Sequence, residues 1–159
     1  MKTKPLALIV DDNLRVRGTL EDRVAELEHD FHSVGSQREA CEHLDLHTYD
    51  YILLDLELPA RSGKPPRAEV GMELLRQIKE HPRNRAALVL SMSAHFGPDS
   101  ELGDEMIELG AAAWIGKPFD DLHGAIKGML AQDPRKRNDE LEALIWRIIS
   151  AAIFFPLPP

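Results

Sequence analysis

Residues 6–12 read LALIVDD, an aliphatic run without polar alternation that stops at two aspartates. Continuous aliphatic runs of this length are typical of strands that a parallel sheet buries on both faces. Residues 51–55 read YILLD and repeat the pattern, with one acid at the end. Two buried strands that each end on an acid predict an α/β fold with carboxylates along one edge of its sheet.

Helical and strand-like segments alternate along the chain around these two runs. Asn13 and Ser36 are suitable helix N-caps, the latter with Glu39 three residues on as a capping-box partner. Five alternations call for a three-layer, doubly wound parallel sheet with helices on both faces. We expect strands at 6–10, 31–34, 51–54, 87–90 and 113–115, and helices at 13–29, 36–47, 71–80, 99–109 and 120–130.

The composition places the chain among ordinary globular proteins. Of 159 residues, 43% are apolar and 29% are charged, which argues against a disordered chain or a coiled-coil rod. The net charge of −8 disfavours direct binding to nucleic acids or anionic membranes, which needs clustered Lys and Arg. A single cysteine, Cys41, cannot form an internal disulfide, and neither a signal peptide nor a membrane-spanning run is evident. We therefore expect a cytoplasmic protein.

The last part of the chain differs from the alternating region. We expect the α/β domain to occupy residues 1–132, and a linker, an amphipathic helix and a proline-rich tail to occupy residues 133–159. Apolar residues form a complete stripe along the helix predicted at 138–153, and such a stripe needs a partner surface. A homodimer through residues 138–153 is the favoured use, with packing on the same chain as the alternative. The segment is too short for a helix-turn-helix module, so a complete chain would act through protein contacts.

Three acids follow the predicted strands. Asp11 and Asp12 end the first strand and Asp55 ends the third, so neighbouring strands would bring the three carboxylates together. Like charges crowded at one spot repel, and they either raise a pKa or hold a hard divalent cation such as Mg²⁺. An aspartate pair at a strand end also serves commonly as a helix N-cap only, and this alternative stays open on these residues alone.

Two further strand ends supply a hydroxyl and an ammonium group. Ser93 and Ala94 follow the fourth strand, and Lys117 and Pro118 follow the fifth. A phosphoryl group on Asp55 would need such partners, because a cation and a lysine offset its negative charge and a hydroxyl donates to one of its oxygens.

Several short motifs therefore occur in order at the predicted strand ends. They are Asp11-Asp12, Asp55 with Pro59 and Gly71, Ser93-Ala94, and Lys117-Pro118-Phe119. Each dipeptide alone is a weak signal, but the ordered set resembles the receiver domain of two-component response regulators and is similar to the chemotaxis regulator. The resemblance covers residues 4 to about 132 and implies a flavodoxin-like five-stranded sheet of order 2-1-3-4-5.

The resemblance also implies roles for single residues. Asp55 would be the phosphoacceptor, and Lys117 would pair with it or with its phosphoryl group. Ser93, beside Ala94, would be the switch hydroxyl that binds the phosphoryl group. Trp114 matches the family's aromatic switch position.

The same resemblance implies a metal site and a backbone feature. The bond before Pro118 would be cis, which aims the lysine back at the site. The implied Mg²⁺ ligands are Asp12, Asp55 and the backbone carbonyl of Glu57, with Asp11 acting mainly through a metal-bound water.

The function implied is a phosphorylation-controlled switch rather than a turnover enzyme. Its partners would be a histidine kinase or phosphotransfer protein and a downstream protein. One alternative is a receiver-like adaptor that works without phosphorylation. A second is an aspartate-nucleophile phosphohydrolase, which chain order disfavours because the acid pair comes first and Glu57 stands where that family has an aspartate.

The sequence departs from the usual receiver pattern in two places, and it offers an alternative to one site residue. Eleven residues separate Pro59 from Gly71, where the family usually has a short turn. We interpret the 60–70 loop as a solvated insertion, with a partner-selecting or anion-attracting flap as the alternative. Trp114 stands where Tyr or Phe is commoner. Ser91 is a second hydroxyl near the site, although Ser93 is the one adjacent to Ala94.

Two residues are expected at the mouth of the site. Glu57 lies two residues after Asp55, and His95 lies two residues after Ser93. Receiver geometry would let both modulate dephosphorylation by helping or blocking the hydrolytic water. The alternative is that both are exposed and inert.

The seven histidines show no metal-binding motif. Neither H-E-x-x-H nor a Cys/His spacing occurs, so no structural zinc is predicted. His43 and His47, four residues apart on a predicted helix, are interpreted as surface neighbours.

Overall fold

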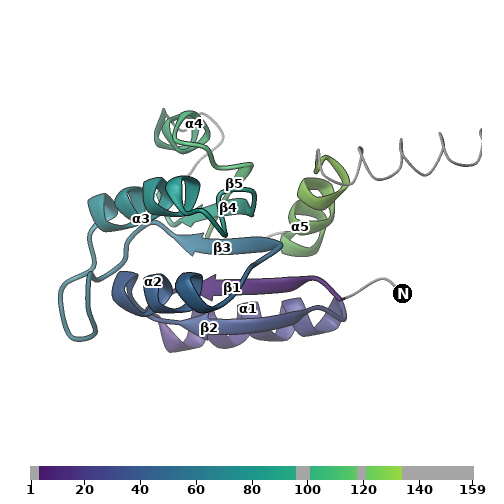
Figure 1. The fold of residues 1–159 in the computed structure, drawn as a ribbon, viewed down its shortest axis with the longest axis horizontal. Helices are drawn as coiled ribbons and strands as arrows, with labels where there is room; N and C mark the ends of the chain where they lie inside the picture. The colour runs from purple at the N-terminus through teal and green to yellow at the C-terminus, as the bar shows by residue number, and fades with distance from the viewer. Residues whose placement is uncertain (1–3, 96–100, 118–120, 134–159) are drawn as a thin grey trace, which may run out of the picture.

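The computed structural model describes residues 4–95, 101–117 and 121–133 (Figure 1). Five parallel strands form one sheet of order β2-β1-β3-β4-β5, as expected from the sequence. The predicted cis bond at Pro118 and the predicted helix at 138–153 lie outside the described residues and stay predictions. The strands are β1 Leu6–Val10, β2 Asp30–Val34, β3 Tyr51–Asp55, β4 Leu88–Ser93 and β5 Ala113–Gly116.

The helices alternate with these strands along the chain. They are α1 Leu14–Glu26, α2 Gln37–Leu46, α3 Ala68–Glu80, α4 Glu101–Glu108 and α5 Leu122–Ala131. Asn13 caps α1 as predicted, because its side chain accepts hydrogen bonds from the N–H groups of Arg15 and Val16. The helix ends three residues earlier than expected, since Glu28 takes a left-handed φ of 61° that turns the chain into β2.

The capping box predicted for α2 forms only in part. The Ser36 hydroxyl accepts from the Glu39 N–H at 3.2 Å, as expected. The Glu39 carboxylate, however, accepts from the N–H of Gly35 rather than from that of Ser36. The N–H groups of Gln37 and Arg38 donate to the carbonyls of Pro59 and Ala60, so the chain after β3 completes the cap of α2.

Strand β4 extends three residues beyond its predicted end. Ser91, Met92 and Ser93 pair with Trp114, Ile115 and Gly116 of β5. The two serines interrupt the aliphatic run that marked the strand in the sequence, yet both are fully buried. Their pairing carries the strand to the edge where the acids lie.

Two hydrophobic cores cover the two faces of the sheet, which gives the expected three layers. On one face Leu8, Ile52 and Leu54 pack with Leu44 of α2 and with α3 through Leu74, Leu75 and Ile78. On the other face Ile9, Leu53 and Leu90 pack with α1 through Leu20 and Val24 and with α5 through Leu122 and Ile126. The alternation of β1 and β3 side chains between the two cores explains why both strands read as unbroken aliphatic runs.

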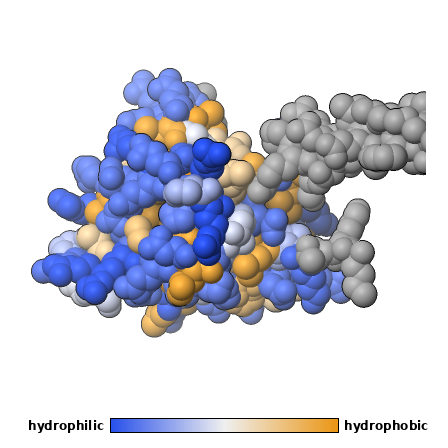
Figure 2. Space-filling model, in the orientation of Figure 1, coloured by the Kyte–Doolittle hydropathy of each residue, from blue (hydrophilic) through white to orange (hydrophobic). Residues whose placement is uncertain are grey.

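The inserted loop after β3 forms an exposed hairpin. Leu58 and Arg67 pair as an antiparallel bridge at its base, and residues 61–67 are exposed. Figure 2 shows a largely hydrophilic surface at this end of the molecule. The prediction of a solvated insertion fits this exposure. No helix in the described ranges has the length and apolar character needed to cross a bilayer.

Candidate functional site

The predicted acidic cluster forms at the carboxyl ends of β1 and β3. These strands are direct neighbours, with Val10 opposite Leu54, so Asp11 directly after β1 and Asp55 at the end of β3 meet at one edge. One carboxylate oxygen from each of Asp11, Asp12 and Asp55 lies within 4.8 Å of the others. The prediction that these three carboxylates lie together is confirmed.

The three acids differ in exposure, which separates their electrostatic environments. Asp11 is fully buried, Asp55 is 3% exposed and Asp12 is exposed. Burial raises the pKa of the Asp55 carboxyl to about 7, and the negative charge of Asp11 adds to this rise while Lys117 opposes it. Partial burial and the charge of Asp11 also raise the pKa of Asp12. A cation bound here would therefore favour the ionised form of Asp55.

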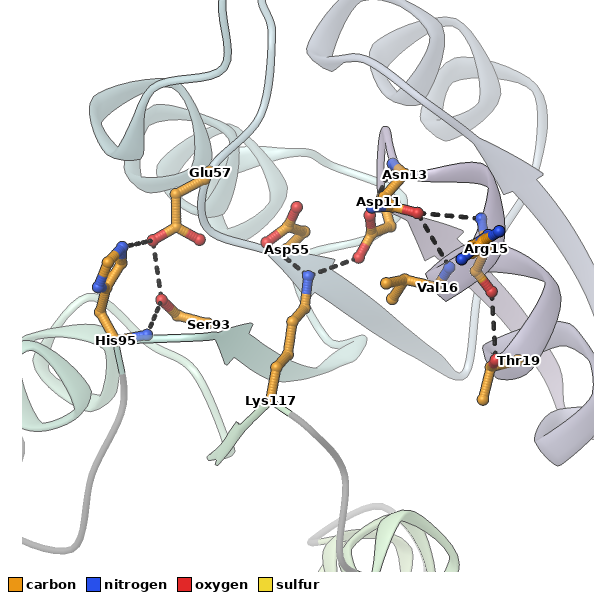
Figure 3. A network of polar contacts seen from close by, with 10 residues as sticks. All are labelled: Asp11, Asn13, Arg15, Val16, Thr19, Asp55, Glu57, Ser93, His95 and Lys117. Atoms are coloured by element: carbon orange, nitrogen blue, oxygen red, sulfur yellow. Dashed lines mark hydrogen bonds and ion pairs between the residues drawn. The ribbon is translucent and has the colours of Figure 1, made fainter.

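Lys117 bridges the two buried acids. Its Nζ lies 2.8 Å from Asp11 Oδ2 and 3.1 Å from Asp55 Oδ1 (Figure 3). Burial acts to lower the pKa of Lys117, but the hydrogen bond to Asp11 and the charges of both acids outweigh burial and raise it. The prediction that Lys117 pairs with Asp55 is confirmed, and its shorter bond to Asp11 was not predicted.

A divalent cation with oxygen ligands fits the charge and the donor set of this cluster. One ammonium group faces three carboxylates, which leaves an excess of negative charge. Among the described residues, the buried Asp55 Oδ1 has no polar partner besides Lys117, whose Nζ lies 3.1 Å away. Mg²⁺ prefers a site with few carboxylates and room for other oxygen ligands. Asp11, Asp12 and Asp55 would hold such an ion, and the Glu57 carbonyl stays a predicted ligand.

Ser93, Glu57 and His95 form a second polar group beside the acids (Figure 3). The Ser93 hydroxyl donates to Glu57 Oε1 at 2.8 Å, and the His95 N–H donates to Ser93 Oγ at 3.0 Å. His95 Nε2 lies 3.8 Å from the same Glu57 oxygen. The structure thus brings both predicted mouth residues to the predicted switch hydroxyl. The bond between Ser93 and Glu57 was not predicted, because no local pattern signals a pairing across two strands.

The remaining predicted residues lie close to the same edge. Ala94 follows Ser93 and is exposed. Trp114 on β5 is half-buried against α4, where a Cβ added to Gly103 would stand 2.6 Å from its ring. The alternative hydroxyl, that of Ser91, is fully buried and has no hydrogen-bond partner in the described structure. Ser93 is therefore the serine whose hydroxyl contacts another side chain of the site.

The raised pKa of Asp55 predicts a pH-dependent stability of the metal-free protein. Because this pKa is about 7 in the folded state and near 3.8 in the unfolded chain, folding favours the protonated acid, and that stabilisation is lost as pH rises through 7. We expect Asp55→Asn to be more stable than the wild type by an amount that grows between pH 5.5 and pH 8. The growth should be on the order of a few kcal/mol at most. Urea unfolding of both proteins in EDTA measures it, and parallel pH curves would contradict the assigned cause.

Comparisons with known proteins point to one family. A family model of the response regulator receiver domain matches residues 7–127. The chain is similar to the response regulator ArlR of Staphylococcus saprophyticus, with 30% identity over 143 residues that cover 87% of this chain and 58% of ArlR. It is also 30% identical over 137 residues to the response regulator protein PilR of Pseudomonas aeruginosa, covering 86% of this chain and 27% of PilR. The chain thus matches about half or less of the length of these relatives.

A solved structure supports the same fold. The chemotaxis response regulator CheY4 of Vibrio cholerae superposes with a TM-score of 0.62 at 18% identity, over 84% of this chain and 98% of CheY4. The sheet order, the acids at the ends of β1 and β3 and the lysine after β5 fit the resemblance inferred from the sequence. From the family match over most of its length, we conclude that the chain belongs to the response regulator receiver domain family.

Proposed function

We propose that the chain accepts a phosphoryl group on Asp55, in a Mg²⁺-dependent reaction, from a histidine kinase or a phosphotransfer protein. The observation that carries this proposal is the buried Asp55 carboxylate, which lies 3.1 Å from Lys117 Nζ beside the carboxylates of Asp11 and Asp12. The phosphorylated form would then change its binding to a downstream protein. We place this exchange in the cytoplasm, in keeping with a single cysteine and no disulfide.

The proposed transfer follows from the positions of the side chains. An ionised Asp55 oxygen attacks phosphorus, an oxygen–phosphorus bond forms, and the phosphorus–nitrogen bond of the phosphohistidine breaks as its imidazole leaves. Lys117 offsets the negative charge that the phosphoryl group brings to Asp55. A Mg²⁺ ion bound by the three acids would supply further positive charge beside the same oxygens.

The contacts of Ser93 suggest how phosphorylation would change the domain. The Ser93 hydroxyl donates a hydrogen bond to Glu57. To bind a phosphoryl oxygen beside Ala94, it must give up this bond. A phosphoryl group on Asp55 would compete for the hydroxyl and would also repel the Glu57 carboxylate. The rearrangement would alter the contacts of Glu57 and His95 and reach Trp114 on the neighbouring strand.

Incubation with acetyl phosphate tests the proposal directly. We expect intact-mass spectrometry to show one added phosphoryl group with Mg²⁺ and none with EDTA. A lack of incorporation from acetyl phosphate, phosphoramidate and phosphorylated histidine kinases would contradict the proposal and favour an adaptor that works without phosphorylation.

The two mouth residues are expected to control the lifetime of the phosphorylated state. Glu57 is partly buried and His95 is exposed, and both contact Ser93. Receiver geometry would place both side chains beside the path of a hydrolytic water, so Glu57→Ala and His95→Ala should each change the dephosphorylation rate several-fold. The Mg²⁺ dependence of phosphorylation should stay intact. Half-lives equal to wild type in both variants and in the double variant would exclude this role.

Trp114 is expected to report the switch by fluorescence. Trp146 lies outside the described residues and contributes background emission, so the measurement uses a Trp146→Phe variant. We expect phosphorylation to change the emission of the remaining Trp114, because its ring packs against α4 beside the strand that carries Ser93. Unchanged emission on a protein that mass spectrometry shows to be phosphorylated would contradict a switch role for Trp114.

A further inference from the structure

Three histidines gather away from the proposed phosphorylation site. His32 lies on β2, an edge strand, His43 lies on α2, and His47 is the C-cap of that helix. The ring centroid of His32 is 5.6 Å from that of His43 and 4.4 Å from that of His47. The centroids of His43 and His47 are 6.1 Å apart. His43 and His47 are neighbours because they lie four residues apart. The packing of α2 on the sheet brings the imidazole of His32 beside them.

The ring separations are close to those around a single tetrahedral ion. Zinc binds imidazole nitrogen at about 2.0–2.1 Å, and a ring centroid lies roughly 1 Å beyond that nitrogen, so rings around one ion stand about 5 Å apart. The observed separations of 4.4, 5.6 and 6.1 Å bracket this value. All three residues are half-buried, so the rings are packed by neighbours yet reachable from solvent.

Hydrogen bonds already orient two of the rings. His43 Nδ1 lies 3.1 Å from the backbone carbonyl of Glu39, and a carbonyl only accepts, so Nδ1 carries the proton and the Nε2 lone pair is free. His32 Nδ1 lies 2.7 Å from the hydroxyl of the buried Tyr49. Metal-binding histidines typically have the second ring nitrogen bonded in this way, which sets the tautomer and the ring direction.

A buried asparagine holds the backbone beneath the cluster. The Asn84 side chain is fully buried, and its Nδ2 donates to the carbonyls of Leu44 and His47 at 2.9 and 2.8 Å. Its Oδ1 accepts from the Tyr49 N–H at 2.8 Å. Asn84 therefore ties the backbone of His47 and Tyr49 to the turn after α3. This backbone is held by buried hydrogen bonds, which limits how far the His47 ring can move.

We propose that His32, His43 and His47 bind one divalent transition ion of borderline softness, with Zn²⁺ as the representative. Imidazole nitrogen suits Zn²⁺, Cu²⁺ and Ni²⁺ and is a poor ligand for Mg²⁺, so this site and the acidic cluster select different metals. Within the described ranges only Asp11, Asp12 and Asp55 already have their ligand atoms within 4.8 Å of one another. Binding at the histidines therefore includes a rotation of the His47 ring, which makes no hydrogen bond among the described residues, and a water or an external group completes the coordination.

Calorimetric titration with Zn²⁺ in excess Mg²⁺ tests the proposal, because Mg²⁺ would occupy the acidic cluster. We expect one Zn²⁺ per chain in the wild type and at least tenfold weaker binding in His32→Gln and in His47→Gln. His123→Gln is the matched control, since His123 lies on α5 on the opposite face of the sheet. It should bind Zn²⁺ as the wild type does, as should Asp12→Asn.

Two results would overturn the assignment. The first is equal Zn²⁺ affinity in the wild type and in the triple variant His32→Gln, His43→Gln and His47→Gln. The second is loss of binding in Asp12→Asn, which would place the ion at the acidic cluster. Circular dichroism of each variant checks that the fold is kept. A Ni²⁺ titration of the wild type and the triple variant measures the loss of imidazole ligands independently.

Discussion

Asp55→Asn is expected to abolish phosphoryl incorporation from acetyl phosphate completely. An amide keeps the size and shape of the side chain but has no ionised oxygen to attack phosphorus. The fold should survive, because the substitution removes one of three crowded carboxylates, and Lys117 keeps its ion pair with Asp11. Intact-mass spectrometry with Mg²⁺ measures the loss, and thermal unfolding shows whether the variant is folded.

The matched control for this loss is Asp22→Asn. Asp22 lies on an exposed part of α1, so the same chemical change there should leave incorporation at the wild-type level. Incorporation that persists in Asp55→Asn would mean that another residue is the phosphoacceptor. A loss in both variants would mean that incorporation depends on the net negative charge of the domain rather than on the Asp55 carboxylate.

Gly71→Ala is expected to destabilise the domain strongly. A Cβ at Gly71 would overlap the carbonyl oxygen of Leu56 and would stand 2.7 Å from the carbonyl carbon and Cα of that residue. These are backbone atoms, so no rotamer change relieves the clash, and α3 is held in place by its buried leucines and isoleucine. We expect unfolding free energy to fall by about 3 kcal/mol or more.

The same substitution should impair the site, since Leu56 directly follows the proposed phosphoacceptor, Asp55. Any backbone shift that accommodates the new methyl group moves the chain that carries Asp55, and we expect slower incorporation in whatever fraction stays folded. Urea unfolding and the rate of incorporation are measured on the same preparation.

Gly18→Ala is the control for the effect of the methyl group itself. Gly18 lies inside α1, and a Cβ there meets no atom within 4 Å. Alanine loses less backbone entropy than glycine in a helix, so this variant should gain about 0.5–1 kcal/mol. The two substitutions should thus have opposite signs, and a similar loss in both would contradict the steric explanation for Gly71.

Local patterns in the sequence predicted the elements that depend on near neighbours in the chain. The aliphatic runs at 6–10 and 51–54 identified the buried strands, because a strand covered on both faces has no polar side to show. Asn13 and Ser36 identified two helix starts, since a cap bonds to backbone only two or three residues away. The end of β4 was missed because Ser91 and Ser93 are buried polar residues inside a strand.

The sequence by itself determined the fold class and the set of acids at the strand ends, because both follow from the order of buried strands and of the residues that end them. Only the tertiary structure decided the partners of the side chains. Lys117 bonds to Asp11 across 106 positions, Ser93 donates to Glu57 across 36, and His32 joins two histidines of α2. Such pairs depend on strand register and helix packing, which arise from the summed burial of the whole core and leave no local pattern in the chain.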